Sequence, residues 1–265
     1  MVAKLRRWKT NDLREIAATQ HRREIDEIAE IWQRKPLLRT IYHDFYLQSG
    51  YWLSEIAGGI VEIGAGIGGL KTILPGCIST DMFPSPWTDQ CENVYRLSFA
   101  DESLANIVML DVFHHLQYPG DALAECLRVL VRGGRVLIFE PDMGALGLLV
   151  YGLFHHEPLG LRQQIQWRCD RTQPESSGMY YASQSNAYRI FLQKSGKALL
   201  RDWDVLPIMR FAALSYVAAG GFRKRQFYPE SWYLSMKFVD KVLSRFPSLF
   251  STRMLVVLQK KDSNP

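Results

Sequence analysis

Apolar and charged positions alternate with a helical period through the first fifty residues. Thr10 or Asn11 provides a helix cap, and an apolar stripe then runs through residues 10–33, formed by Leu13, Ile16, Ala17, Ile25, Ile28 and Ile31. Pro36 predicts the start of a second helix. Its aromatic positions are Tyr42, Phe45, Tyr46, Tyr51 and Trp52. The chain therefore begins with a pair of predicted helices.

From residue 59 the pattern changes to short apolar runs, which cover residues 59–63, 77–80, 106–110 and 135–139. Residues 121–130 have the spacing of an amphipathic helix. The glycine run after the first strand is expected to open another helix. Short apolar strands that alternate with helices predict an α/β fold with a mostly parallel sheet.

Residues 142–200 do not continue this alternation of strands and helices. Mixed polar residues there include His155, His156, Tyr180 and Tyr181, and a helix is predicted from about residue 186 to 200. The apolar run from Met143 to Phe154 is twelve residues long and too short to span a bilayer. Residues 203–211 and 252–260 are two further strand candidates, with an aromatic-rich stretch between them. The simplest interpretation is a core sheet with extra segments grafted near its end.

The net charge of +5 is concentrated in the N-terminal region. Residues 1–40 hold ten Lys or Arg against six acids, a net of +4. A basic front is compatible with contact to nucleic acid or an anionic membrane. Acids and bases interleave there at helical spacing, which favours a solvated helix face. Hydrophobic residues make up 47% of the chain, enough for a full core.

The four cysteines show no paired spacing and are interpreted as reduced thiols in a cytoplasmic protein: Cys77, Cys91, Cys126 and Cys169. The polar, charged N-terminus predicts no secretory signal.

A glycine cluster, Gly64–Gly69, follows the first predicted strand. Its glycines allow a tight turn and a ligand lying against the backbone. Gly64, Gly66 and Gly69 also satisfy the G-x-G-x-x-G pattern of dinucleotide sites. Glu62, two residues earlier, would repel a pyrophosphate but favour a ligand that carries an ammonium and a sulfonium. Asp81, at the end of the next strand, can accept hydrogen bonds from the two hydroxyls of a ribose, which NAD and S-adenosylmethionine (SAM) both contain.

Three segments between residues 58 and 142 carry a family resemblance. They read V-E-I-G-A-G-I-G and then T-D, L-S-F-A-D-E-S-L-A-N-I-V-M-L-D-V-F-H-H-L, and E-C-L-R-V-L-V-R-G-G-R-V-L-I-F-E-P-D. In this order and spacing they resemble the class I SAM-dependent methyltransferases, in the small-molecule, type 11-like branch that includes quinone-biosynthesis C-methyltransferases. The remainder (F-H-H-E-P, S-N-A, G-G-F-R, R-M-L-V-V-L) is similar to a bacterial set associated with polysaccharide gene clusters.

The resemblance implies SAM as cofactor and a role for each matching position. Glu62 and the backbone of residues 64–68 should hold the methionine end, Asp81 the ribose, and Met82 the adenine. Asn93 stands where the family has an acidic residue, and Ser98 where it has a proline. The implied cofactor residues are Glu62, Gly64, Ala65, Gly66, Gly68, Asp81, Met82, Asn93, Val94, Asp111 and Val112.

Four histidines are candidates for catalysis. His114 and His115 belong to the family's H-H-L signature, which more often packs near the cofactor. His155 and His156 lie after the fourth strand, where class I enzymes place substrate elements, so they are candidates for a general base or a substrate ligand. Each pair could also be structural or solvated. Two adjacent histidines without a third ligand at a fixed spacing argue against zinc, so no metal is expected.

We therefore predict a Rossmann-like three-layer sandwich with a seven-stranded, mostly parallel sheet whose last strand is antiparallel. Residues 1–57 form an N-terminal helical cover, and residues 58–265 form the SAM-binding domain with cap insertions at about 142–185 and 212–250. The expected function is methyl transfer to a small-molecule, lipid or glycan-type acceptor, with oxygen as the favoured target and with peripheral membrane contact open. Residues 111–114 lack the Asn-Pro-Pro-Tyr motif of many adenine and glutamine methyltransferases, which makes a nucleic-acid partner unlikely. The alternatives are an NAD(P)-dependent oxidoreductase and a SAM-fold binding protein without activity.

Overall fold

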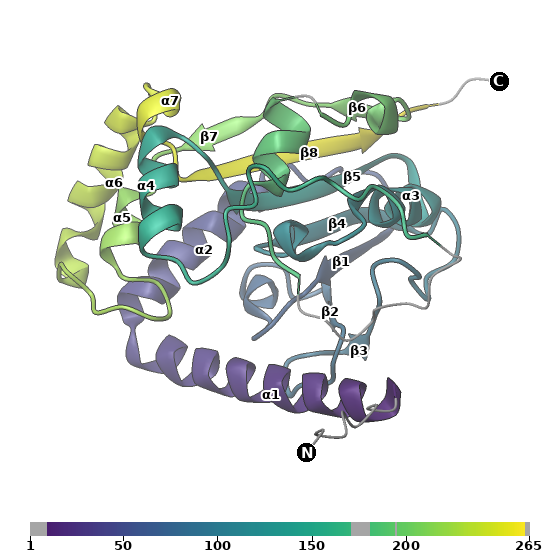
Figure 1. Ribbon diagram of the computed structural model, residues 1–265, viewed down its shortest axis with the longest axis horizontal. Coiled ribbons are helices and arrows are strands. Elements are labelled where there is room, and N and C mark those ends of the chain that lie inside the picture. The colour runs from purple at the N-terminus through teal and green to yellow at the C-terminus, as the bar shows by residue number, and fades with distance from the viewer. Residues whose placement is uncertain (1–9, 171–180, 194, 263–265) are drawn as a thin grey trace, which may run out of the picture.

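The computed structural model describes residues 10–170, 181–193 and 195–262. Two helices open the chain, α1 (Thr10–Arg34) and α2 (Pro36–Gly50), as the helical period predicts. Figure 1 shows α1 passing the end of the sheet where β2 and β3 lie, while α2 runs back along the sheet. Tyr51 and Trp52, expected on the second helix, follow its last residue.

A single mixed sheet forms the centre of the protein. Its strands are β1 (Gly59–Ile63), β2 (Ile78–Asp81), β3 (Gln90–Cys91), β4 (Leu104–Leu110), β5 (Leu130–Pro141), β6 (Trp203–Val205), β7 (Met209–Phe211) and β8 (Arg253–Lys260). They follow the order β3-β2-β1-β4-β5-β8-β6, with β7 also paired to β8. The first five strands are parallel, and β8 is antiparallel to β5, β6 and β7. The predicted Rossmann-like class with an antiparallel last strand is confirmed.

Two apolar clusters cover the two faces of this sheet. Alternate residues of one strand point to opposite faces, so Ile107 and Met109 join one cluster and Val108 the other. The first cluster packs under α3 (Pro119–Val129) and residues 187–192, and the second under α2 and α5 (Leu214–Ala218). These layers make the three-layer sandwich.

The helical elements after β5, other than α5, lie in the two segments predicted as insertions or, for residues 188–200, between them. They are α4 (Ala145–Leu153), the π-helix Tyr188–Leu192, the 3₁₀ turns Lys197–Leu200 and Glu230–Trp232, α6 (Tyr233–Leu243) and α7 (Pro247–Phe250). Within the described residues, none of the helices has both the length and the apolar character needed to cross a bilayer.

Three sequence expectations about elements are wrong in detail. The glycine run opens one 3₁₀ turn, Gly69–Thr72, rather than a longer helix. The helix expected over residues 186–200 is interrupted: the π-helix ends at Leu192 and a 3₁₀ turn begins at Lys197. The strand expected over 203–211 divides into β6 and β7 around Pro207, which has no N–H for the ladder. This division, together with the short strand β3 that no pattern predicted, gives the sheet eight strands.

Candidate active site

The glycine loop connects β1 to β2 at the carboxyl end of the parallel strands. Gly64, Gly66 and Gly68 have φ values of +68°, +54° and +66°, a left-handed conformation that side chains disfavour. A Cβ on Gly66 would meet only Ile25 of α1, at 3.7 Å, so the backbone at Gly66 lies open apart from this helix. The loop therefore offers a backbone surface for a ligand beneath α1.

Glu62 lies under this loop with 2% of its surface exposed. Burial raises the pKa of its carboxyl to about 8, although a hydrogen bond from the Leu70 backbone acts to lower that pKa. Its Oε2 is buried and has no hydrogen-bond partner among the described residues. Such an atom needs a donor, and the ammonium of a methionine moiety is a suitable one. The residues around the loop thus fit the methionine end of SAM.

Asp81 ends β2 beside the loop, as predicted. Its carboxylate accepts hydrogen bonds from the Gly66 N–H (3.1 Å) and the Met82 N–H (2.7 Å). His21 of α1 lies 3.3 Å from Asp81 through Nε2, and its ring also contacts Phe83. The hydrogen bond to Asp81 outweighs burial and raises the pKa of His21. Asp81, the residue expected to bind the ribose, is thus paired with His21 of α1. The sequence had predicted this helix only as part of the N-terminal cover.

The other predicted cofactor positions differ in accessibility. Met82 is 54% exposed beside Asp81. Asn93 is exposed, and its side-chain oxygen accepts the Tyr95 N–H, whereas Val94 is buried in the core. The Ala65 N–H donates a hydrogen bond to the Thr80 carbonyl. Val112 packs against Gly64 so closely that a Cβ on Gly64 would lie 2.4 Å from Val112 Cγ2. Of these positions, Met82 is the one placed at the surface next to the glycine loop.

Asp111, at the end of β4, forms a two-point ion pair with Arg253 of β8. Arg253 Nη1 donates to Asp111 Oδ1, and Nη2 lies 3.1 Å from Asp111 Oδ2. Tyr42 Oη lies 3.5 Å from the same Oδ2. The guanidinium is buried and lies 4.6 Å from the centre of the Tyr216 ring. Asp111 has a φ of +57°, which is unusual outside glycine. This pair fixes Asp111 in a strained conformation at the strand end, where the methyl group is expected.

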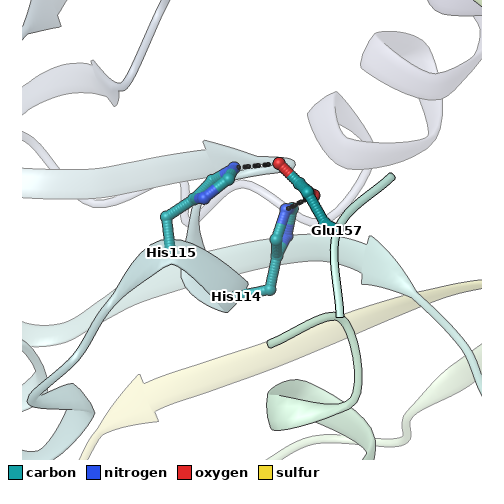
Figure 2. Close-up of side chains that lie close together, drawn as sticks. All are labelled: His114, His115 and Glu157. Carbon is teal, nitrogen blue, oxygen red and sulfur yellow. Dashed lines mark ion pairs between the residues drawn. The ribbon is translucent and has the colours of Figure 1, made fainter. Parts of the chain in front are cut away.

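The four candidate histidines converge on one carboxylate, Glu157. Figure 2 shows His114 and His115 pointing toward it, with Nε2 of each 3.5 Å and 3.8 Å from its oxygens. The loop after α4 supplies the other pair, with His155 Nδ1 and His156 Nε2 each 3.7 Å from Glu157. The histidine pairs, 40 residues apart in the sequence, therefore form one cluster.

The charges of this cluster are set by burial and by two carboxylates. Burial opposes the charge on His114, but Glu140, 2.6 Å from Nδ1, and Glu157 together raise the pKa of His114 to about 10. Burial and the charge of His114 lower the pKa of His115 to about 4. Burial likewise lowers the pKa of His155 to about 4. At neutral pH, His115 and His155 are therefore neutral and His114 carries a proton.

Residues 181–186 complete the floor of the cluster. The Tyr181 carbonyl lies 3.2 Å from His115 Nδ1, and the Ser183 N–H bonds the His114 carbonyl. Gln184 donates from its side-chain amide to Glu157. Within the described part of the chain, three buried side-chain oxygens here have no hydrogen-bond partner: Gln184 Oε1, Ser185 Oγ and Asn186 Oδ1. Tyr180, the other tyrosine predicted at this site, lies outside the described residues.

Sequence reasoning missed Glu157, Glu140, His21 and Arg253. A signal for Glu157 was present, because it directly follows His155 and His156 in F-H-H-E-P. The other three act only through contacts with segments far away in the sequence. No local pattern marks them.

Comparison with known proteins supports the reading of the central segment. Residues 78–138 match a family model described as a methyltransferase domain. No curated protein matches the chain. A solved SAM-dependent methyltransferase of Thermotoga maritima is 15% identical, with 90% of this chain and 99% of that chain covered and a TM-score of 0.49. A SAM-dependent methyltransferase of Archaeoglobus fulgidus is 11% identical, with 84% and 94% covered and a TM-score of 0.49. At these values neither says anything about the acceptor.

Proposed function

We propose that this class I SAM-dependent methyltransferase methylates a hydroxyl group of a small-molecule, lipid-linked or glycan-type acceptor. The observation that carries the proposal is the cluster around Glu157, which adjoins the end of β4 where Asp111 and Val112 lie. Hydroxyl methylation needs a group that takes up a proton, whereas much of the remaining acceleration comes from alignment.

His155 and His156 are the proposed acceptors of that proton. Burial lowers the pKa of His155, so its ring is neutral at neutral pH and has a nitrogen lone pair. The proton on a methylated hydroxyl oxygen is far more acidic than an imidazolium, so even this weakly basic ring can accept it. Bound SAM supplies a methyl group on a sulfonium, a good leaving group. The acceptor oxygen bonds to the methyl carbon as the carbon–sulfur bond breaks, and its proton passes to the histidine pair. His114 is unsuitable as this base, because the carboxylates beside it keep it protonated.

Residues 142–185, of which 171–180 lie outside the described residues, are proposed to form the cap over the acceptor with help from 212–235. Support comes from the contacts of Glu157 and Tyr181 with His114 and His115, which bring this insertion to the end of β4. The unpartnered oxygens of Gln184, Ser185 and Asn186 favour an acceptor that donates several hydrogen bonds, such as a polyhydroxylated one. Residues 1–57 are proposed as the cover over the cofactor, which the contact of His21 with Asp81 supports.

A product analysis tests the proposal. Full-length protein is incubated with SAM carrying a ¹³C-labelled methyl group and panels of polyol, lipid-linked, amine and thiol acceptors. Nuclear magnetic resonance then distinguishes O-methyl from N-, S- and C-methyl products. Replacing His155 and His156 together with alanine should lower turnover on an O-acceptor by about 100-fold, the usual contribution of a general base. S-adenosylhomocysteine (SAH) affinity should be unchanged. An N- or C-methyl product, or full turnover by the variant, would contradict the proposal.

Peripheral contact with an anionic membrane is the second part of the proposal. Leu234, Phe238 and Val242 recur every four residues along α6, and all three are exposed. The same end of the protein includes α7, which contacts α4. Large apolar side chains are also exposed on α4, at its C-terminal end and on α7: Leu148, Leu149, Leu153, Phe154 and Leu249. Exposed basic residues accompany it: Arg223, Lys224, Arg225, Lys241 and Arg245. An apolar face flanked by bases is typical of interfacial binding.

Vesicle flotation tests this contact. Wild-type protein should float with vesicles that contain phosphatidylglycerol more than with pure phosphatidylcholine, and less at high salt. Replacing Leu234 and Phe238 with serine should abolish flotation. The matched control, Leu47→Ser, removes an exposed leucine from α2 and should have no effect. Equal recovery with both lipids, or flotation of the double variant, would refute the contact.

A further inference from the structure

We propose that His114, His115 and Glu157 bind a divalent transition-metal ion, with zinc as the first candidate. Two imidazole nitrogens and one carboxylate form a ligand set that zinc accepts, with a further coordination position left open. In Figure 2 the three side chains point toward one another. They come from the loop after β4 and from the loop after α4.

Each histidine is held with its Nε2 toward this carboxylate. Glu140 accepts a hydrogen bond from His114 Nδ1 at 2.6 Å and is itself fixed by the Phe113 N–H. The Tyr181 carbonyl accepts a hydrogen bond from His115 Nδ1 at 3.2 Å. An ion that displaces the second proton of His114 leaves a proton on Nδ1 of each ring and takes the Nε2 lone pairs as ligands. Metal-binding histidines characteristically donate from their other nitrogen to a carboxylate or a backbone carbonyl.

The distances suit one ion between the three groups. Glu157 lies 3.5 Å from His114 Nε2 and 3.8 Å from His115 Nε2. All candidate ligand atoms of the set fall within 4.8 Å of one another. Ligand atoms about 2.0–2.1 Å from a tetrahedral zinc ion stand about 3.3 Å apart. Small side-chain adjustments are therefore enough to enclose an ion.

The charges also favour a cation. Glu140 and Glu157 put two nearly inaccessible carboxylates around one imidazole ring. A buried pair of negative groups requires compensating positive charge. The protonated His114 ring supplies one such charge in the metal-free protein, and a divalent ion that displaces its Nε2 proton would supply two. The Gln184 side chain holds Glu157 in place, while its own Oε1 is buried without a partner among the described residues. This oxygen can accept a hydrogen bond from a water bound to the ion.

The other two histidines of the cluster are partly exposed, as His115 is. His155 and His156 side chains are 33% and 46% exposed, against 4% for His114. An acceptor hydroxyl on the ion would become more acidic, as metal-bound water does, and its proton would reach these histidines. That catalytic use rests on the proposed function, whereas the binding of the ion does not.

Zinc binding to full-length protein, first stripped with a chelator, tests the site. Calorimetry should find one Zn²⁺ per chain, and Co²⁺ should give the visible absorption of a site with nitrogen and oxygen ligands. His115→Ala and Glu157→Gln should each weaken zinc binding by more than about 100-fold, exceeding the effect of losing an outer-shell partner. His43→Ala removes an exposed histidine from α2 and should bind zinc like the wild type. Circular dichroism checks that each variant folds, and His115, the more exposed ligand, gives the safer variant.

Two results would overturn the inference. One is an absence of stoichiometric zinc binding to the wild type. The other is zinc affinity that survives both His115→Ala and Glu157→Gln, or that falls equally in His43→Ala. Titration of SAH into the metal-free and zinc-loaded samples separates this inference from the proposed function. SAH binding without zinc binding removes only the metal site, and zinc binding without SAH binding removes only the cofactor assignment.

Discussion

The pairing of Asp81 with His21 leads to a quantitative prediction about cofactor affinity. The Asp81 carboxylate accepts two backbone hydrogen bonds and lies 3.3 Å from His21 Nε2. A ribose bound there has to displace the imidazole of His21. Asp81→Ala removes the ribose anchor, and His21→Ala removes its competitor. The two substitutions should therefore change SAH affinity in opposite directions.

The magnitudes follow from the contacts. Two hydrogen bonds from ribose hydroxyls to a carboxylate contribute about 1.5 kcal/mol each, or about 3 kcal/mol. The partly exposed ion pair with His21, which the wild type gives up on binding, is worth about 1 kcal/mol. Asp81→Ala should thus cost about 2 kcal/mol, or about 30-fold in affinity. His21→Ala should tighten SAH binding about 5-fold, and it should have no effect in the Asp81→Ala background.

The gain from His21→Ala should depend on pH. Asp81 raises the pKa of His21 above its ordinary value of about 6.5, with Glu24 as a weaker contributor. The ion pair is complete below that ordinary value and is lost as the pH rises through the raised pKa. Wild-type SAH affinity should accordingly increase with pH above about 6.5, whereas that of His21→Ala should depend less on pH.

Isothermal titration calorimetry with SAH between pH 6 and pH 9 measures all four forms of this cycle. Circular dichroism and thermal unfolding verify that the variants keep the fold. Unchanged affinity in a folded Asp81→Ala variant would refute the assignment of the ribose anchor. If His21→Ala weakens SAH binding instead, the histidine contacts the cofactor and does not compete with it.

Two further predictions concern the loop and the core. Gly66→Val should abolish SAH binding, because φ is +54° there and a β-branched residue strains this loop conformation. The circular dichroism spectrum should stay near that of the wild type. Normal SAH binding by this variant in calorimetry would mean that the glycine cluster is only a turn. Arg210→Ala should lower the free energy of unfolding by about 3–5 kcal/mol, since Asp142 is fully buried with Arg210 Nε 2.6 Å away. Urea unfolding measures this loss, and Arg201→Ala, at an exposed ion pair, should change it by less than about 0.5 kcal/mol; an equal loss in both variants would contradict the reasoning.

Local patterns were sufficient for the central strands of the sheet and for the glycine loop. The strand predicted at residues 59–63 is β1, and the runs at 106–110 and 135–139 lie within β4 and β5. Each buried strand needs a continuous apolar run, and the left-handed turn after β1 needs glycine, so composition and spacing carry this information. The end of β2 at Asp81 was predictable for the same reason.

Tertiary structure decided what surrounds these elements. The close approach of Gly196 to the Trp167 ring and the pairing of both β6 and β7 with β8 join segments that are far apart in the sequence. No local period encodes either contact, since each partner lies far away in the sequence.

The histidine cluster illustrates the same division. The sequence contains two histidine pairs, and the lack of a third ligand at a fixed spacing argued against a metal site. Folding brings the loop after α4 back to the end of β4, so that Glu157 meets both pairs and Glu140 orients His114. The sequence by itself determined which residue types were present and which strands they follow. Only the packing of an insertion against a strand end 40 residues earlier set their distances, burial and charge, because those quantities depend on neighbours in space rather than along the chain.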